Sequence, residues 1–289
     1  MRTGPVIALL VASAFVVILN ETIMGVALPR LMVDLQISAA TAQWLTTGFL
    51  LTMAVVIPLT GYVLARFPIR GVFFTAMSLF AAGTLIAALA PGFGMLLAGR
   101  VVQASGTAIM MPLLMTTVLN VVEPARRGRM MGVISIVIAV APAIGPTVSG
   151  LILSVLDWRW MFWLVLPIAL LAIALGAIWV QNVTETREAR FDVGSVVLSA
   201  LGFGGLIFGL SSIGESAAGH APVPVWIPLV VGALSLAAFV MRQLKLQRSD
   251  AALLDLRTFQ SRSFSLAVVL VVVVMSALFG SLILLPLYL

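Results

Sequence analysis

Apolar stretches of about 20 residues recur along the whole chain, and charged residues fall almost only between them. A stretch of about that length is what an α-helix needs to cross the hydrocarbon core of a bilayer, which is roughly 30 Å thick. Charged residues make up 9% of the 289 residues and apolar residues 62%, whereas soluble domains contain roughly 25% and 45–50%. The sequence therefore excludes a soluble fold and predicts an all-α polytopic membrane protein.

Other classes of protein lack the residues that they require. Short segments of alternating apolar and polar residues, typical of a membrane β-barrel, do not occur. The net charge is +6, but the basic residues lie at the ends of the apolar stretches, so we expect no nucleic-acid partner. The chain has no cysteine, no H-E-x-x-H, no G-x-S-x-G and no phosphate-binding loop with a lysine. We therefore predict no metal, no cofactor and no enzymatic activity.

The apolar runs and the breaks between them predict nine membrane spans. They cover residues 5–29, 42–64, 71–90, 94–121, 130–153, 161–180, 193–213, 225–241 and 264–289. The first run is too long for a signal peptide and has no small-residue cleavage site, so we interpret it as a membrane helix.

The basic residues are distributed unevenly between the two sides of the predicted bundle. Of 16 lysines and arginines, only Arg30 and Arg159 fall in loops on the side opposite the N-terminus, and Arg100 lies inside a span. Cytoplasmic loops retain an excess of Lys and Arg. We therefore expect a multi-pass protein of the cytoplasmic (inner) membrane, with its N-terminus in the cytoplasm.

The order of long and short loops and the position of the polar segments predict how the spans are grouped. Spans one to three and spans four to six have the same order of long and short loops, with Pro58 and Pro146 at matching positions, which predicts two three-helix repeats of the kind found in transporters. The polar stretch after span eight predicts an amphipathic helix or linker at the membrane surface. We predict a six-span bundle over 1–180, two additional spans over 181–241, a cytoplasmic amphipathic linker over 242–263 and a further span over 264–289. The abrupt apolar end at Leu289 leads us to expect a truncated chain.

Two ionisable residues, Glu21 and Arg100, lie well inside predicted spans, where charged groups are costly and are functional candidates by default. With a rise of 1.5 Å per residue, both lie roughly 10–12 Å below the outer face. A nearby cation favours the ionised form of a carboxyl group, whereas burial favours the neutral form. The pair therefore predicts a switchable proton site; a static ion pair, or side chains that reach to the interface, is the alternative.

Span five is rich in proline and small residues, which bend a helix and allow close helix contact. They are Pro142, Gly145, Pro146, Ser149 and Gly150. The pattern predicts a tight helix crossing, with or without a role in a mechanism. Gly205 and Gly209 have G-x-x-x-G spacing, which we interpret as packing.

These segments, in this order, resemble the major facilitator superfamily, and in particular its 14-span drug:proton antiporters. Residues 19–29 are similar to that family's span-one motif, 100–106 to its span-four motif, 141–150 to its span-five antiporter motif and 61–70 to the motif of the loop between spans two and three. The resemblance covers essentially the whole chain. It implies the major facilitator fold, with an N-terminal six-helix bundle, two extra helices and the first helix of an incomplete C-terminal bundle.

The resemblance also implies roles for individual residues. Proton coupling would fall to Glu21 and Arg100, and the substrate cavity would include Asn20, Glu21 and Gln103. The antiporter motif would comprise Pro142, Gly145, Pro146, Ser149 and Gly150, and the gating loop Gly61, Arg66 and Arg70. The partners would be a small amphipathic drug, protons and the lipid bilayer.

The sequence departs from the family pattern at two places. Asn20 stands where the span-one motif usually has aspartate, and Ala65, Pro68 and Ile69 replace Asp, Gly and Arg of the loop motif, so a gating salt bridge that needs the loop aspartate is absent. At these positions the sequence resembles the lincomycin-resistance branch of the family. That resemblance implies export of lincosamides and other amphipathic drugs by alternating access. A truncated, non-transporting membrane protein that acts by association is the alternative.

Overall fold

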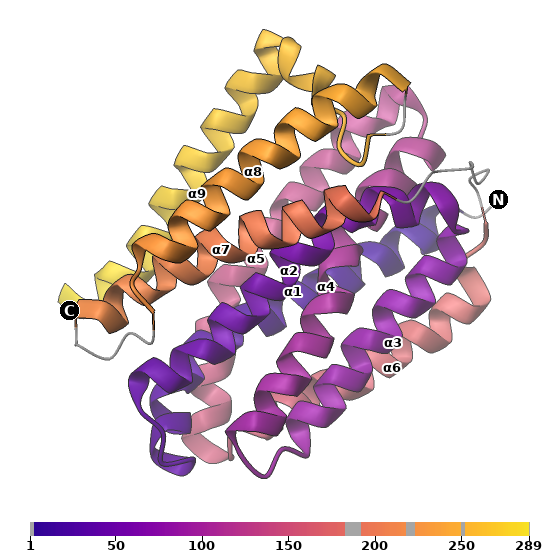
Figure 1. The fold of residues 1–289 in the computed structure, drawn as a ribbon. Helices are drawn as coiled ribbons and strands as arrows, with labels where there is room; N and C mark the ends of the chain where they lie inside the picture. The colour runs from indigo at the N-terminus through magenta and orange to yellow at the C-terminus, as the bar shows by residue number, and fades with distance from the viewer. Residues whose placement is uncertain (1–2, 183–191, 218–222, 250–251, 289) are drawn as a thin grey trace. The chain divides into compact units, whose positions relative to one another are not determined.

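The computed structural model describes residues 3–182, 192–217, 223–249 and 252–288, and these residues form helices and no strand (Figure 1). The α-helices are α1 (Thr3–Asp34), α2 (Ala39–Arg66), α3 (Ile69–Ala88), α4 (Phe93–Val121), α5 (Pro124–Val155), α6 (Trp160–Trp179), α7 (Val193–Ala217), α8 (Trp226–Leu246) and α9 (Arg262–Tyr288). The predicted all-α class is confirmed.

Among the described residues, eight helices, α1 to α8, are long and apolar enough to cross a membrane. In the part of α9 that the structure describes fully, a shorter apolar helix covers Arg262–Ala277. The polytopic organisation is therefore confirmed, whereas the ninth span over 264–289 remains a prediction.

Several helices extend beyond the predicted apolar runs. α1 continues through Pro29 to Asp34, and an ion pair between Arg30 Nε and Asp34 Oδ2 at 3.3 Å joins two positions four residues apart in its last turns. The Ser38 hydroxyl then caps α2 by accepting a hydrogen bond from the backbone N–H of Thr41. α5 begins at Pro124 because the first N–H of a helix has no intrahelical partner, so proline fits there.

The chain divides into two compact units, Met1–Phe239 and Val240–Leu289, and the predicted division of the first at residue 180 remains a prediction. In the first unit α3 packs on α4 and α6, α1 packs on α4, α5 and α6, and α2 packs on α4 and α7 (Figure 1). If α1, α2 and α3 are matched to α4, α5 and α6, the packing of α1 on α5 corresponds to the packing of α4 on α2, and both pairs are present. This symmetry agrees with the two predicted three-helix repeats.

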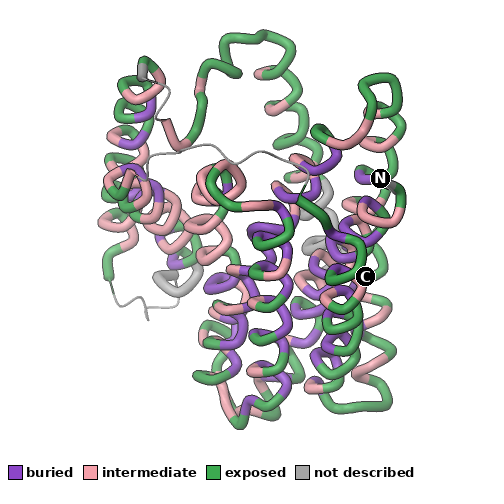
Figure 2. Tube along the Cα trace, turned by 90° about the vertical axis from the view of Figure 1, so that its right-hand side faces the viewer, coloured by how far each residue is buried: buried purple, intermediate pink, exposed green. Residues whose placement is uncertain are grey.

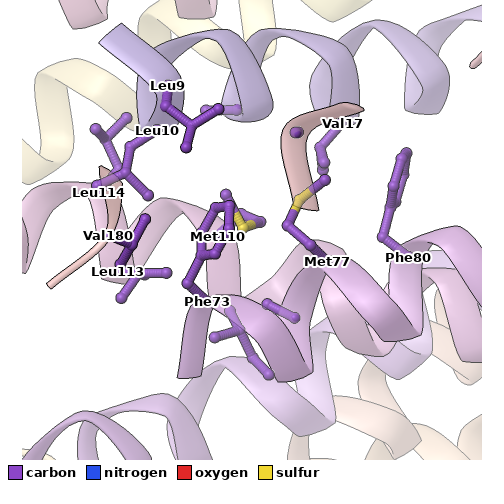
Figure 3. Packing of buried hydrophobic residues seen from close by; sticks show 14 of the residues in the cluster. Leu9, Leu10, Val17, Phe73, Met77, Phe80, Met110, Leu113, Leu114 and Val180 are labelled. Carbon is purple, nitrogen blue, oxygen red and sulfur yellow. The ribbon is translucent and has the colours of Figure 1, made fainter. Parts of the chain in front are cut away.

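Two clusters of buried apolar side chains form the core of the first unit. One joins the first half of α1 to α3 and α4, with Leu10, Phe73 and Leu113 fully buried (Figure 3). The other joins the second half of α1 to α2 and the start of α6, around Leu45 and Phe162. Buried stretches alternate with exposed ones along the helices (Figure 2). The residues between the two clusters on α1, α3 and α4 include polar side chains, and they form the site described below.

The second unit contains the stretch that the sequence left open as an amphipathic helix or a linker. Its described residues comprise the end of α8, which continues to Leu246, and two short 3-10 helices, η1 (Gln247–Ser249) and η2 (Leu256–Gln260), and the amphipathic linker over 242–263 remains a prediction. The Gln243 side-chain oxygen accepts a hydrogen bond from the backbone N–H of Leu253 at 2.8 Å, so the linker folds back against the end of α8.

Asp255 begins η2 by accepting the backbone N–H of Arg257. The hydrogen bond from the Arg257 side chain is the main reason that the pKa of Asp255 lies below its ordinary value.

Candidate functional site

The site begins with a close approach of α3 and α4. A Cβ atom at Gly83 would overlap the backbone of Gln103, and one at Gly99 would lie 2.8 Å from the backbone nitrogen of Ala87. Gly106 meets the backbone of α3 in the same way. Because Gly99, Gln103 and Gly106 share one helical face, the glycines bring the Gln103 side chain directly onto α3.

A chain of buried hydrogen bonds runs from α4 to α3 at this crossing. Arg100 donates through a terminal guanidinium nitrogen to Gln103 Oε1 at 2.6 Å, and Gln103 Nε2 donates to Thr84 Oγ1 at 2.8 Å. Thr84 in turn donates to the carbonyl of Phe80 at 2.6 Å. Each donor is thus oriented by the next acceptor, and the amide of Gln103 is fixed at both ends.

Arg100 is held from α1 and α2 as well. The same guanidinium nitrogen donates to Asn20 Oδ1 at 3.2 Å, and Arg100 Cζ lies 4.0 Å from the centre of the Phe49 ring, in a cation–π contact. Arg100 is 1% exposed, and its Nε has no acceptor among the described residues. The acceptors of this buried guanidinium are amide oxygens rather than a carboxylate. We call Asn20, Phe49, Thr84, Arg100 and Gln103 the polar layer.

Glu21, the neighbour of Asn20, lines a cavity of about 370 Å³ between α1, α2 and α4. Four methionines lie in the wall: Met53, Met110, Met111 and Met115. Glu21 is the ionisable residue of this lining, and the rest is apolar apart from Thr107. The cavity is therefore an apolar, sulfur-rich space with one carboxyl group, and we call it the methionine cavity.

The structure separates the predicted site residues into two groups. Glu21 faces the methionine cavity, whereas Asn20 and Gln103 are 3% and 0% exposed and bond to Arg100. Consecutive helical residues point about 100° apart, which accounts for the different surroundings of Asn20 and Glu21. Within the described residues no ion pair joins Glu21 to Arg100, although their charges interact through space. The alternative of a static ion pair is therefore not the arrangement found.

The antiporter-motif residues dock α5 on α1 directly after Glu21. A Cβ at Gly145 would overlap the Thr22 side chain, and Ser149 Oγ donates to the carbonyl of Ile23 at 3.1 Å. Pro142 is buried and Pro146 half-buried, whereas Gly150 is exposed in open space. Most of the motif thus fixes the part of α1 that carries the candidate proton site.

The predicted gating-loop residues differ in their contacts. Gly61 and Arg66 are exposed. Arg70 donates from its guanidinium to the carbonyl of Ala177 at 3.1 Å, and its backbone N–H donates to Asn182 Oδ1. Arg70 therefore caps the C-terminal end of α6 within the first unit, where a cation is favourable.

Sequence reasoning missed Phe49, Thr84 and the four cavity methionines. A hydroxyl in the middle of an apolar span is a signal for an interhelical hydrogen bond, so the role of Thr84 could have been predicted from the sequence. Apolar residues in apolar helices carry no such signal. Gly205 and Gly209, interpreted as packing residues, do lie against α8, next to Gly232 and Leu229.

The family model described as Major Facilitator Superfamily matches residues 10–289. The chain belongs to the major facilitator superfamily. Among solved structures, the crystal structure of peptide transporter POT in complex with sulfate aligns with a TM-score of 0.61 over 84% of this chain and 52% of that chain, at 17% identity. That likeness concerns the fold alone, and it confirms the predicted major facilitator fold. The proteins of this superfamily that the chain resembles are transporters and not enzymes.

Relatives with higher identity specify the branch of the superfamily. Lincomycin resistance protein LmrB of Listeria monocytogenes is 46% identical over 289 residues, and that of Bacillus subtilis is 43% identical over 288 residues. Both alignments cover 100% of this chain and 60% of the relative. The chain therefore spans about 60% of the length of these curated relatives, and the predicted resemblance to the lincomycin-resistance branch is confirmed.

Proposed function

We propose that this major facilitator chain acts in proton-coupled export of amphipathic drugs or antibiotics, such as lincosamides, by alternating access across the cytoplasmic membrane. The observation that carries the proposal is the methionine cavity with Glu21 in its wall. The names of the LmrB relatives support a lincosamide as one substrate.

The composition of the cavity suits a drug site. Its volume of about 370 Å³ falls in the range of about 300–1,000 Å³ that is typical of small-molecule pockets. Methionine side chains are unbranched and polarisable, so a wall of them adapts to ligands of different shape. A single carboxyl group in such a wall supplies one polar contact to an otherwise apolar ligand.

The arrangement around Glu21 also supports proton coupling. Burial and a fixed cation act in opposite directions on the two protonation states of a carboxyl group. Asn20 and Gln103 hold Arg100 near Glu21 without an ion pair between them. Glu21 is thus left to gain and lose a proton within one transport cycle, while Arg100 keeps its place.

The test uses the protein encoded by the native reading frame that contains these residues. Glu21→Gln keeps the size and hydrogen bonding of the side chain but cannot exchange a proton. We expect lincomycin binding to persist and protonophore-sensitive efflux to fall to background. Asp34→Asn makes the same chemical change on the same helix at the surface and serves as the control. Efflux by Glu21→Gln at the parental rate from pH 6 to 8 would place the proton site elsewhere.

We also propose that the N-terminus lies in the cytoplasm, on the basis of the uneven distribution of basic residues. The chain has no cysteine, so single cysteines can report sidedness. Ala40→Cys and Gln260→Cys both replace exposed residues. A membrane-impermeant maleimide should label Ala40→Cys in intact cells and Gln260→Cys only after permeabilisation. The reverse labelling pattern would show that the N-terminus lies outside the cell.

A further inference from the structure

A guanidinium group and a carboxylate that lie near each other inside a protein normally form a bidentate ion pair, which is stronger than hydrogen bonds to neutral amides. Arg100 and Glu21 form no such pair among the described residues, although the charge of Arg100 acts on Glu21. No other charged group acts on Glu21 from the described parts of α2, α4, α5 and α6. Arg100 Nε has no acceptor among the described residues, so a donor is available to a carboxylate. Other contacts must therefore hold Arg100 away from this pair.

The Phe49 ring makes the contact that covers the face of the guanidinium group. Arg100 Cζ lies 4.0 Å from the ring centre, and Phe49 is 1% exposed. A cation–π contact is strongest where both groups are removed from water. The hydrogen bonds to Asn20 and Gln103 both come from one terminal nitrogen, so they fix one end of the guanidinium group and not its plane. The ring thus fixes the orientation that the hydrogen bonds leave open.

The position of the ring is set by the packing of α2. A Cβ atom at Gly48 would lie 2.9 Å from the Leu97 side chain, so α2 lies close against α4 beside Phe49. Met53 follows Phe49 by one turn on the same face of α2 and lines the methionine cavity together with Glu21. The face of α2 that covers the guanidinium therefore continues into the wall of the cavity.

We propose that Phe49 is a positioning residue for proton coupling, whose ring holds the Arg100 guanidinium on its amide acceptors and away from the Glu21 carboxylate. The inference rests on the proposed function, in which Glu21 carries the proton. A carboxylate in a bidentate ion pair is held in its ionised form, so it would not take up a proton in each cycle. Phe49 is not part of the cavity lining, so it acts through Arg100 and not on the drug.

Substitutions of Phe49 separate the ring face from the volume of the side chain. Phe49→Leu removes the ring, and the Glu21 carboxylate then becomes the strongest acceptor near the guanidinium. Phe49→Met fills more of the volume without a ring and should behave as Phe49→Leu does. Phe49→Tyr keeps the ring face.

Phe73→Leu is the matched control for the loss of a buried ring. Phe73 is fully buried, like Phe49, but it packs in an apolar cluster and against the ring of Phe74. Among the described residues no cation lies over its ring. The control therefore makes the same chemical change without a cation–π contact.

The first experiment measures the protonation of Glu21 directly. Infrared difference spectra between pH 6 and pH 8, recorded on the purified protein encoded by the native reading frame, contain the C=O band of a protonated carboxyl group. The part of this band that Glu21→Gln removes belongs to Glu21. We expect that part in the parent, Phe49→Tyr and Phe73→Leu, and a decrease of about tenfold in Phe49→Leu.

The infrared outcomes distinguish this inference from the proposed function. A Glu21 band of equal size in Phe49→Leu and in the parent would overturn the role of Phe49 and leave the proposed function standing. A parent spectrum to which Glu21 contributes nothing would overturn the proposed proton site, and the role of Phe49 with it.

The second experiment separates drug binding from turnover. The Kd for lincomycin should stay within about twofold in all four variants, whereas the maximal rate of protonophore-sensitive efflux should fall about tenfold in Phe49→Leu and Phe49→Met. Phe49→Tyr and Phe73→Leu should keep at least about half of the parental rate. Circular dichroism confirms that each variant is folded. Equal losses in Phe49→Leu and Phe73→Leu, or in Phe49→Leu and Phe49→Tyr, would show that Phe49 acts by packing alone and would overturn the proposal.

Discussion

Asn20 and Glu21 are neighbours in the sequence, yet they belong to two different regions of the first unit. Asn20 lies in the polar layer, where Arg100, Gln103 and Thr84 bond to one another between apolar clusters. Glu21 lines the methionine cavity, where flexible apolar side chains surround one carboxyl group. A single helix thus presents a fixed surface on one side and an adaptable one on the other.

Under the proposed function, this difference would let the protein bind varied ligands without losing its internal order. Hydrogen bonds within the polar layer have little freedom because leaving a buried partner unpaired is costly. Methionine side chains in the cavity change rotamer at small cost. If the two regions differ in this way, substitutions in the layer destabilise the fold, whereas substitutions in the cavity change function with little effect on stability.

Arg100→Ala should have the largest effect on stability. It removes the donor to Asn20 and Gln103 and leaves their oxygens buried without a partner, beside a space where the guanidinium was. We expect the free energy of unfolding to fall by about 3 kcal/mol, measured by unfolding in mixed detergent–SDS micelles. Arg100→Lys keeps the charge but not the planar fork, so it should lose less. A stability of Arg100→Ala equal to the parent would show that the layer is not a stabilising network.

Gly83→Ala probes the close approach of α3 and α4 that brings Gln103 to Thr84. Its Cβ would lie 2.7 Å from the Cα atom of Gln103, so the helices have to move apart. We expect a loss of about 2 kcal/mol in the same unfolding measurement. Gly132→Ala introduces a Cβ into open space on α5 and should not destabilise. Equal behaviour of the two variants would contradict a fixed crossing.

Thr84→Val sharpens the comparison to one hydrogen bond. It removes the acceptor of the Gln103 amide while keeping the shape of the side chain. Thr117→Val is the matched control, because the hydroxyl of Thr117 is also buried and donates only to the carbonyl of Leu113 in its own helix. We expect Thr84→Val to cost about 1 kcal/mol more than Thr117→Val. A difference of zero would mean that the amide does not need this partner.

Composition and span length were sufficient to predict the helical membrane fold, because the bilayer sets both the length and the polarity of each helix. Glu21 and Arg100 were predicted as candidate site residues because ionisable side chains inside membrane spans are rare. Their separation into two regions could not be predicted, since it depends on which way each helix is rotated. Phe49 and the cavity methionines were missed because the sequence does not distinguish an apolar residue that faces lipid from one that faces the core or a cavity.

Glu21→Gln should have the smallest effect on stability, and it is the decisive test from the cavity side. The carboxyl group faces the methionine cavity and takes no part in an ion pair among the described residues, so its replacement leaves no donor or acceptor of the polar layer unpaired. Replacing a half-buried carboxyl group by a neutral amide of the same shape also removes the cost of partly desolvating a charge. We expect the unfolding free energy to change by less than about 0.5 kcal/mol, the range of substitutions outside structural networks. A loss approaching that of Arg100→Ala would assign Glu21 to the polar layer, and the loss of efflux expected for Glu21→Gln would then reflect a damaged fold rather than a missing proton site.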